Sequence, residues 1–164
     1  MQVALYTAAI DDRFGKGVIR SRIGLQESAL LFDAQTAFFE PLREQHQQNT
    51  LACILVDEAQ FLSRQQVDEL ARVVDELDLP VLCFGIRTDF QGELFPGSSR
   101  LLAIADKLAE LKTVCECGRK ATMTVRLDSD GNVVAAGEQV QIGGNEQYVS
   151  KCRRDYRKLM DAVL

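Results

Sequence analysis

Short apolar runs of strand length recur along the first part of the chain, and helical patterns separate them. The runs are VALYT (3–7), LACILVD (51–57) and VLCFGI (81–86). Runs that are apolar at nearly every position suit parallel strands buried on both faces of a sheet. Residues 35–48 predict a helix that carries Phe38, Phe39 and Leu42 on one side.

A second helix is predicted between the last two of these runs. Ser63 and Gln66 have the S-x-x-Q spacing of a capping box, and Pro80 is placed to end the helix. Between them, apolar residues repeat at helical spacing: Val67, Leu70, Val73, Val74 and Leu77. Strand, helix and strand in this order predict a right-handed crossover between parallel strands, and therefore an α/β fold.

The pattern changes near residue 112. Beyond it, the short β-prone segments TMTVRL (122–127) and EQVQIGG (138–144) are separated by Gly, Asn and Asp. Two domains are therefore expected. An α/β core covers residues 1–112, and a small β-rich lobe with a C-terminal helix covers residues 113–164.

Composition and charge narrow the classes of function. The net charge of −5 argues against a general binder of nucleic acid or of anionic membranes. No apolar stretch approaches the roughly 20 residues that span a bilayer, and MQVALYTAAIDDR is unlike a signal peptide. A cytoplasmic protein is expected. The odd count of five Cys argues against a disulfide framework; Cys53 and Cys83 are expected in the core, and His46 on a solvated helix surface.

Two carboxylates end the apolar run in LACILVDEAQF, in the form of a Walker B segment. At the C-terminal end of a parallel strand, Asp57 can hold a magnesium ion, and Glu58 can take a proton from a substrate hydroxyl. The alternative is that the pair only caps a loop. The usual partner of this segment is a phosphate-binding loop, G-x-x-x-x-G-K-[ST], which the sequence does not contain. We therefore expect the first strand and the loop of a P-loop-type parallel sheet to be missing.

Three cysteines form a separate candidate site. Cys115 and Cys117 are separated by one residue, and Cys152 follows in CRRD after a further 34 residues. Two close thiols and a distant third suit a zinc ion that closes the β-rich lobe at its base. Asp155 is a candidate fourth ligand; the alternatives are a water in its place, or three unrelated free thiols.

Four segments, in this order and spacing, resemble the bacterial branch of the type II thymidine kinase family. They are DEAQF (57–61), FGIRTDFQGELF (84–95), LAELKTVCECGRKA (108–121) and IGGNEQYVSKCRRDY (142–156). The resemblance covers nearly the whole chain, from YTAAIDDRFG onward. It departs from the family at the missing phosphate-binding loop and at Asp155, where bacterial relatives have His and others have Cys.

The resemblance implies a role for individual residues. Glu58 would be the catalytic base for the 5′-hydroxyl of thymidine, and Asp57 would serve Mg²⁺. The ATP donor would be bordered by Asp11, Asp12, Arg13, Asp57, Glu58, Ala59 and Gln60. The nucleoside would contact Phe90, Tyr148 and a lasso loop of Gln139, Val140, Gln141, Ile142 and Gly143. A structural Zn²⁺ would be held by Cys115, Cys117, Cys152 and Asp155.

The function that the resemblance implies is transfer of the γ-phosphoryl group of ATP to thymidine, giving thymidine monophosphate. The family also implies a homotetramer. Without a phosphate-binding loop, the 164-residue polypeptide is expected to show no kinase activity by itself. The alternative is a non-catalytic relative that survives as a zinc-stabilised module for nucleoside binding or subunit interaction.

Overall fold

A computed structural model describes residues 2–11, 13, 15–21, 23–140 and 147–163. The chain divides into two compact units. The first contains the residues up to Arg87 together with Pro96–Ile104, and the second contains Thr88–Phe95 and the residues from Ala105 onward. The domain boundary near residue 112 stays a prediction, and the compact units place Thr88–Phe95 with the later part of the chain.

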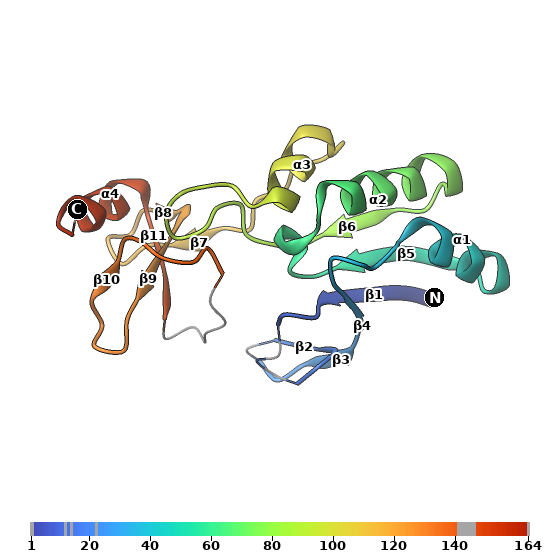
Figure 1. The fold of residues 1–164 in the computed structure, drawn as a ribbon, viewed down its shortest axis with the longest axis horizontal. Helices are drawn as coiled ribbons and strands as arrows, with labels where there is room; N and C mark the ends of the chain where they lie inside the picture. The colour runs from blue at the N-terminus through green and yellow to red at the C-terminus, as the bar shows by residue number, and fades with distance from the viewer. Residues whose placement is uncertain (1, 12, 14, 22, 141–146, 164) are drawn as a thin grey trace. The chain divides into compact units, whose positions relative to one another are not determined.

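The first unit is built on a four-stranded sheet in the order β4-β1-β5-β6, and every neighbouring pair is parallel (Figure 1). Its strands are β1 (Gln2–Ala8), β4 (Leu30–Phe32), β5 (Leu51–Val56) and β6 (Val81–Cys83). The predicted α/β class with a parallel sheet is therefore confirmed. A small antiparallel hairpin of β2 (Val18–Arg20) and β3 (Gln26–Ser28) precedes β4.

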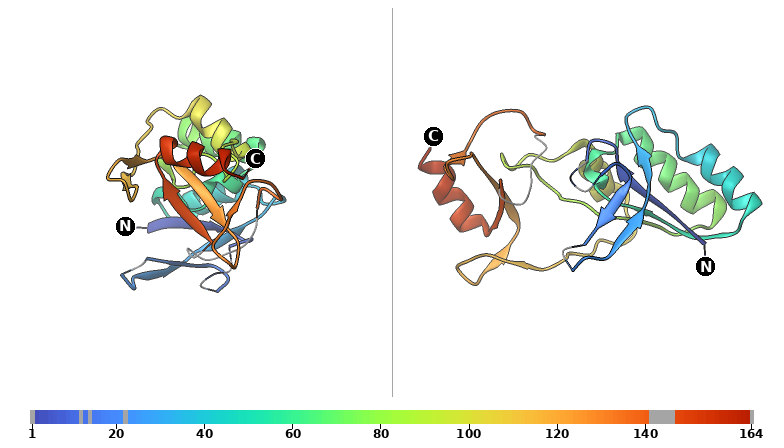
Figure 2. Two further views of the ribbon diagram at one scale, coloured as in Figure 1. Left: turned by 90° about the vertical axis from the view of Figure 1, so that its left-hand side faces the viewer. Right: turned by 90° about the horizontal axis from the view of Figure 1, so that it is seen from below.

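Two helices cover one face of this sheet: α1 (Phe39–Gln48) and α2 (Arg64–Leu77) (Figures 1 and 2). The capping box is confirmed, because the Ser63 side chain accepts from the Gln66 backbone N–H and the Gln66 side chain accepts from the Ser63 N–H. Helix α2 ends at Leu77, where Asp78 takes the left-handed conformation just before Pro80. The apolar faces of both helices enter one core, which includes Phe38, Leu42, Val67, Leu70 and Val73.

The expectation that the strands are buried on both faces is wrong for the described residues. Ile54 and Val56 of β5 lie under the helices and are fully buried, whereas Leu55 on the opposite face is half-buried. Leu82, which pairs with Leu55, is 43% exposed. The continuous apolar run of β5 therefore has one face in the core and one face that is only partly covered. Cys53 and Cys83 are also half-buried, although Cys83 packs against the core.

His46 also differs from expectation, because it is half-buried rather than on a solvated surface. Its Nδ1 accepts a hydrogen bond from the backbone N–H of Leu51, at 3.1 Å, where β5 begins. The side chain thus links the end of α1 to the first residue of the central strand.

Among its described residues, the second unit contains small antiparallel sheets and one helix. β9 (Met123–Leu127) lies between β10 (Val133–Val134) and β11 (Tyr148–Lys151), and β7 (Thr113–Val114) pairs with β8 (Lys120–Ala121). Helix α4 (Arg153–Asp161) packs against β9 (Figure 2). TMTVRL is a strand as predicted, but residues 138–140 of EQVQIGG are not, and the rest of that segment lies outside the described residues.

Helix α3 (Pro96–Ile104) returns to the first unit and packs against α2 and the 3-10 turn η1 (Ala59–Phe61). Among the residues that the structure describes, no helix is both long and apolar enough to cross a bilayer.

Candidate active site and metal centre

The carboxylates of Asp57 and Glu58 follow β5 at its C-terminal end. The Asp57 N–H donates to the Tyr6 carbonyl, and the Ala59 N–H donates to the Phe84 carbonyl, so backbone bonds hold both flanks of Glu58. Glu58 itself has φ 54° and ψ 36°, the left-handed conformation. A non-glycine residue in this region is strained and persists only where its surroundings impose it, which is a common property of functional sites.

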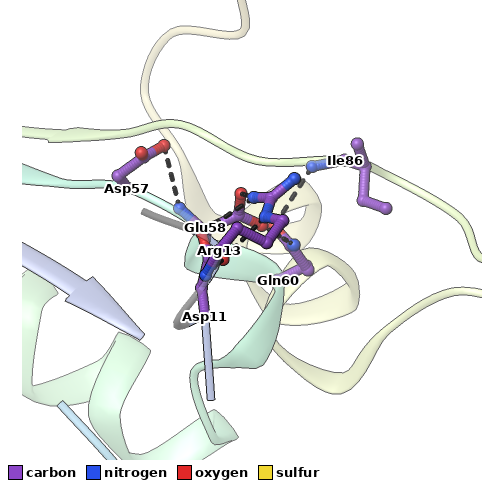
Figure 3. Close-up of polar contacts among 6 residues, drawn as sticks. All are labelled: Asp11, Arg13, Asp57, Glu58, Gln60 and Ile86. Atoms are coloured by element: carbon purple, nitrogen blue, oxygen red, sulfur yellow. Dashed lines mark hydrogen bonds and ion pairs between the residues drawn. The ribbon is translucent and has the colours of Figure 1, made fainter. Parts of the chain in front are cut away.

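Arg13 joins the loop after β1 to this carboxylate pair. Its guanidinium lies 2.6 Å from Asp11 Oδ1 and 2.6 Å from Glu58 Oε1 (Figure 3). The side chains of Arg13 and Glu58 are 33% and 23% exposed, so the ion pair is only partly screened by solvent. Three of the residues expected at the ATP donor, Asp11, Arg13 and Glu58, are therefore brought together.

The second oxygen of the Glu58 carboxylate has a different partner. Gln60 Nε2 donates to Glu58 Oε2 at 2.5 Å (Figure 3). Gln60 is buried, at 2% exposed, and so is Ala59 beside it. Asp12, which was expected beside Arg13, lies outside the described residues.

The titration of these carboxyls depends on burial and on Arg13. Burial raises the pKa of Glu58 above the usual value for glutamate, and hydrogen bonding by Gln60 and the charge of Arg13 oppose that rise. Burial also raises the pKa of Asp57. The hydrogen bond from Arg13 lowers the pKa of Asp11. The Asp11 carboxyl therefore stays ionised to lower pH, whereas Asp57 and Glu58 take up protons more readily than they would in water.

Four of the residues expected to contact a nucleoside are described, Phe90, Gln139, Val140 and Tyr148, and all four lie in the second unit. Gln139 Nε2 donates to Asp89 Oδ2 at 2.9 Å, and Asp89 precedes Phe90. Phe90 is 1% exposed, and the guanidinium of Arg126 stacks over its ring at 3.8 Å. Tyr148 pairs with Arg126 across β9 and β11, and Val140 is half-buried. Gln141, Ile142 and Gly143 lie outside the described residues.

Sequence reasoning missed three residues of this group: Asp89, Arg126 and Tyr156. Asp89 is buried and accepts from the backbone N–H groups of Gln91 and Glu93, while Tyr156 Oη donates to the Phe90 carbonyl at 2.9 Å. Arg126 is buried and donates to the Glu138 carbonyl at 2.9 Å. The sequence offered one signal for this group, the arginine within the strand-forming segment TMTVRL. An arginine buried in a strand requires polar partners, so its presence indicates that such partners lie nearby.

The predicted metal ligands form one cluster. One ligand atom from each of Cys115, Cys117, Cys152 and Asp155 lies within 4.8 Å of all the others. Cys117 Sγ and Cys152 Sγ are 3.6 Å apart, and Cys115 Sγ is 3.4 Å from Asp155 Oδ2. A tetrahedral zinc ion with Zn–S bonds of about 2.3 Å and a Zn–O bond of about 2.1 Å places such pairs roughly 3.8 and 3.6 Å apart. The four side chains therefore fit a zinc ion.

The pKa values of two thiols in the cluster shift in opposite directions, and hydrogen bonding with Asp155 raises the pKa of Cys117 to about 11. Hydrogen bonds from the backbone N–H groups of Cys117 and Cys152 lower the pKa of the Cys115 thiol. Cys115 and Cys152 are buried and Cys117 is exposed. The cluster connects the turn between β7 and β8 with the start of α4.

Comparison with known proteins identifies similar sequences over nearly the whole chain. The family model described as thymidine kinase matches residues 1–156. The thymidine kinases of Salmonella typhimurium strain LT2 and Salmonella paratyphi A are each 58% identical over 161 residues, covering 98% of this chain and 78% of the relative. The thymidine kinase of Escherichia coli strain K12 is 58% identical over 160 residues, with the same shares covered.

Proposed function

The chain belongs to the thymidine kinase family, and from this premise we infer that it is a thymidine kinase. The reaction that we propose transfers the γ-phosphoryl group of ATP to the 5′-hydroxyl of thymidine. A bond forms between the 5′-oxygen and the γ-phosphorus, the bond from that phosphorus to the β–γ bridging oxygen breaks, and ADP leaves. The observation that carries the assignment is the Glu58 carboxylate, held at the end of β5 beside a guanidinium.

Glu58 is the proposed catalytic base, which accepts the proton of the 5′-hydroxyl. Its carboxylate is 23% exposed and therefore reachable, and its strained backbone fixes the point from which the side chain extends. Phosphoryl transfer requires little covalent chemistry from a protein, so positioning of the nucleophile and neutralisation of charge are the main contributions. Glu58 supplies the first of these.

Arg13 and Asp11 are proposed to lie on the ATP side of the site. A guanidinium suits phosphate oxygens because its N–H groups form a planar fork and its charge is permanent. Arg13 is a third exposed, and its bond to Asp11 keeps it beside Glu58. Asp57 fits Mg²⁺ by chemistry, since a carboxylate at this sheet edge is the ligand that Mg²⁺ prefers. A bound Mg²⁺ would neutralise negative charge on the phosphates.

The nucleoside is proposed to bind at residues of the second unit, including Phe90, Tyr148 and the lasso residues from Gln139 onward. The contact of Gln139 with Asp89, the neighbour of Phe90, supports this because it ties the start of the lasso to that segment. Phe90 is 1% exposed and the guanidinium of Arg126 covers its ring, so it contributes packing behind the site rather than an open aromatic surface.

The cluster of Cys115, Cys117, Cys152 and Asp155 is proposed to hold a structural Zn²⁺. The fit of its interatomic distances supports this. A bound zinc would tie together segments of a unit in which the described strands have at most five residues. Small units that bury little surface commonly depend on such a link. Assembly as a homotetramer and a cytoplasmic location stay predictions from the sequence.

Replacing Glu58 by Gln should abolish most turnover and spare binding. The change removes the base while keeping the shape and the contact with Gln60, so kcat should fall by about 10²–10⁴-fold with little change in the Kd for thymidine. Residues 1–164 contain no phosphate-binding loop motif, so the assay uses a form of the protein that carries one. The exposed Glu44→Gln is the matched control. Near-full turnover by Glu58→Gln would exclude Glu58 as the base, and thymidine binding without turnover by the parent would favour the non-catalytic alternative.

The pH dependence of kcat/KM should reflect the environment of Glu58. A base works only when ionised, and burial raises the pKa of this carboxyl. Activity should therefore be present above the raised pKa and be lost as the pH falls through it. The acidic limb should lie above the value of about 4.3 that is usual for glutamate. A profile that stays flat down to that value would contradict the assignment.

Purified protein should contain close to one zinc per chain, and Asp155→His should bind it more tightly. Imidazole is a better zinc ligand than a carboxylate in a site with thiolates. Elemental analysis and chelator competition test both statements, with Asp161→His on the exposed side of the same helix as the control. Chelation should increase hydrogen exchange in residues 115–155 before the parallel sheet opens. Zinc-free protein with an equally protected second unit would refute a structural metal.

A further inference from the structure

Gln60 makes side-chain contacts with both Glu58 and Ile86. It lies in η1 and is 2% exposed, and its amide donates to Glu58 Oε2 at 2.5 Å (Figure 3). The family resemblance implies that Gln60 borders the ATP donor, and its side chain faces the carboxylate proposed as the base.

The orientation of the Gln60 amide is set by the backbone. Gln60 Oε1 accepts from the Ile86 N–H at 3.2 Å, and a backbone N–H can pair only with the oxygen of an amide. The nitrogen must therefore face Glu58. Gly85 makes this arrangement possible, because a Cβ at that position would lie 2.4 Å from Gln60 Oε1.

The segment that orients Gln60 is itself held in place. The Ile86 carbonyl accepts from Ser98 Oγ of α3 at 2.7 Å. A Cβ on Gly97 would lie 2.5 Å from the Ala59 carbonyl oxygen, so α3 begins in direct contact with the turn that carries Gln60. The Glu58 carboxylate is thus connected through Gln60 and Ile86 to the first turn of a helix.

We propose that Gln60 is a positioning residue that orients the Glu58 carboxylate for the proposed phosphoryl transfer. Gln60 occupies Oε2, which leaves Oε1 on the side of the carboxylate that Arg13 reaches. A glutamate side chain has several rotatable bonds, and a second fixed contact removes much of that freedom. Because a displacement of about 1 Å can cost roughly 10²-fold in rate, this orientation contributes to turnover. The proposal depends on Glu58 being the base.

Gln66 provides a matched comparison within the same unit. It is also a buried glutamine, at 3% exposed, and its amide nitrogen also donates. Its acceptors are the backbone carbonyls of Asp33 and Thr36, so it supports structure without contacting the site. The same substitution at the two positions separates positioning from general stability.

Gln60→Glu keeps an oxygen for the Ile86 N–H and replaces the donor that faces Glu58 by a second oxygen. In a form that carries a phosphate-binding loop, we expect kcat to fall by about tenfold or more, with the KM values for thymidine and ATP within about twofold of the parent. Gln66→Glu should lower Tm and leave kcat unchanged. In a Glu58→Gln background, Gln60→Glu should cause no further loss, because the two residues act as one unit.

Several outcomes would overturn the positioning role. One is an unchanged kcat in Gln60→Glu, and another is a raised KM for ATP at constant kcat, which would make Gln60 a nucleotide contact. Additive losses in the Glu58→Gln background would also overturn it. Gln60→Met is a second variant, used in case Gln60→Glu does not fold. Loss of folding in both Gln60→Glu and Gln60→Met would make Gln60 a structural residue. A parent without turnover, or an active Glu58→Gln, would instead contradict the proposed function or its base.

Discussion

The fit of the turn Ala59–Phe61 between two glycines is the constraint on which the candidate active site depends. Gly85 and Gly97 approach this turn so closely that a Cβ on either would lie within 2.5 Å of one of its atoms. The chain leaves β5 and enters the turn through Glu58, whose backbone is left-handed and is flanked by the backbone hydrogen bonds of Asp57 and Ala59. Backbone strain at one residue is thus offset by close packing on both sides.

Charge at the site follows from this placement. The turn holds Glu58 partly buried beside Asp57, which disfavours ionisation of both carboxyls. Arg13, in the loop after β1, places one positive charge beside the carboxylates of Asp11, Asp57 and Glu58. A carboxyl whose pKa is raised by burial, beside a guanidinium that opposes the rise, is suited to accept a proton during a reaction.

Local features of the fold could be predicted from the sequence because their signals lie within a few residues. The capping box at Ser63 and Gln66 and the strand Leu51–Val56 are examples. The metal cluster was also predictable, since two of its thiols are neighbours and the third stands in a matching segment. The open face of the sheet was not, because an apolar run has the same pattern whether one face or both are covered.

The contacts that organise the site could not be predicted from residue patterns alone, because each joins positions far apart in the chain. Arg13 meets Glu58 across 45 positions, and Gln60 meets Ile86 across 26. Family resemblance placed Gln60 near ATP, but its partners depend on which way a buried amide faces. That orientation is imposed by a backbone N–H and by a glycine, neither of which has a distinctive sequence pattern.

The fixed geometry around Glu58 is tested most directly by the turnover of Gly85→Ala in a form of the protein that carries a phosphate-binding loop. The added methyl group must displace the Gln60 amide, from which its Cβ would lie 2.4 Å, while leaving Asp11, Arg13, Asp57 and Glu58 chemically intact. We expect a fall in kcat of about 10²-fold, with the fold retained by circular dichroism and the Kd for thymidine little changed. A folded Gly85→Ala protein with the kcat of its parent would contradict a catalytic role for this fixed geometry.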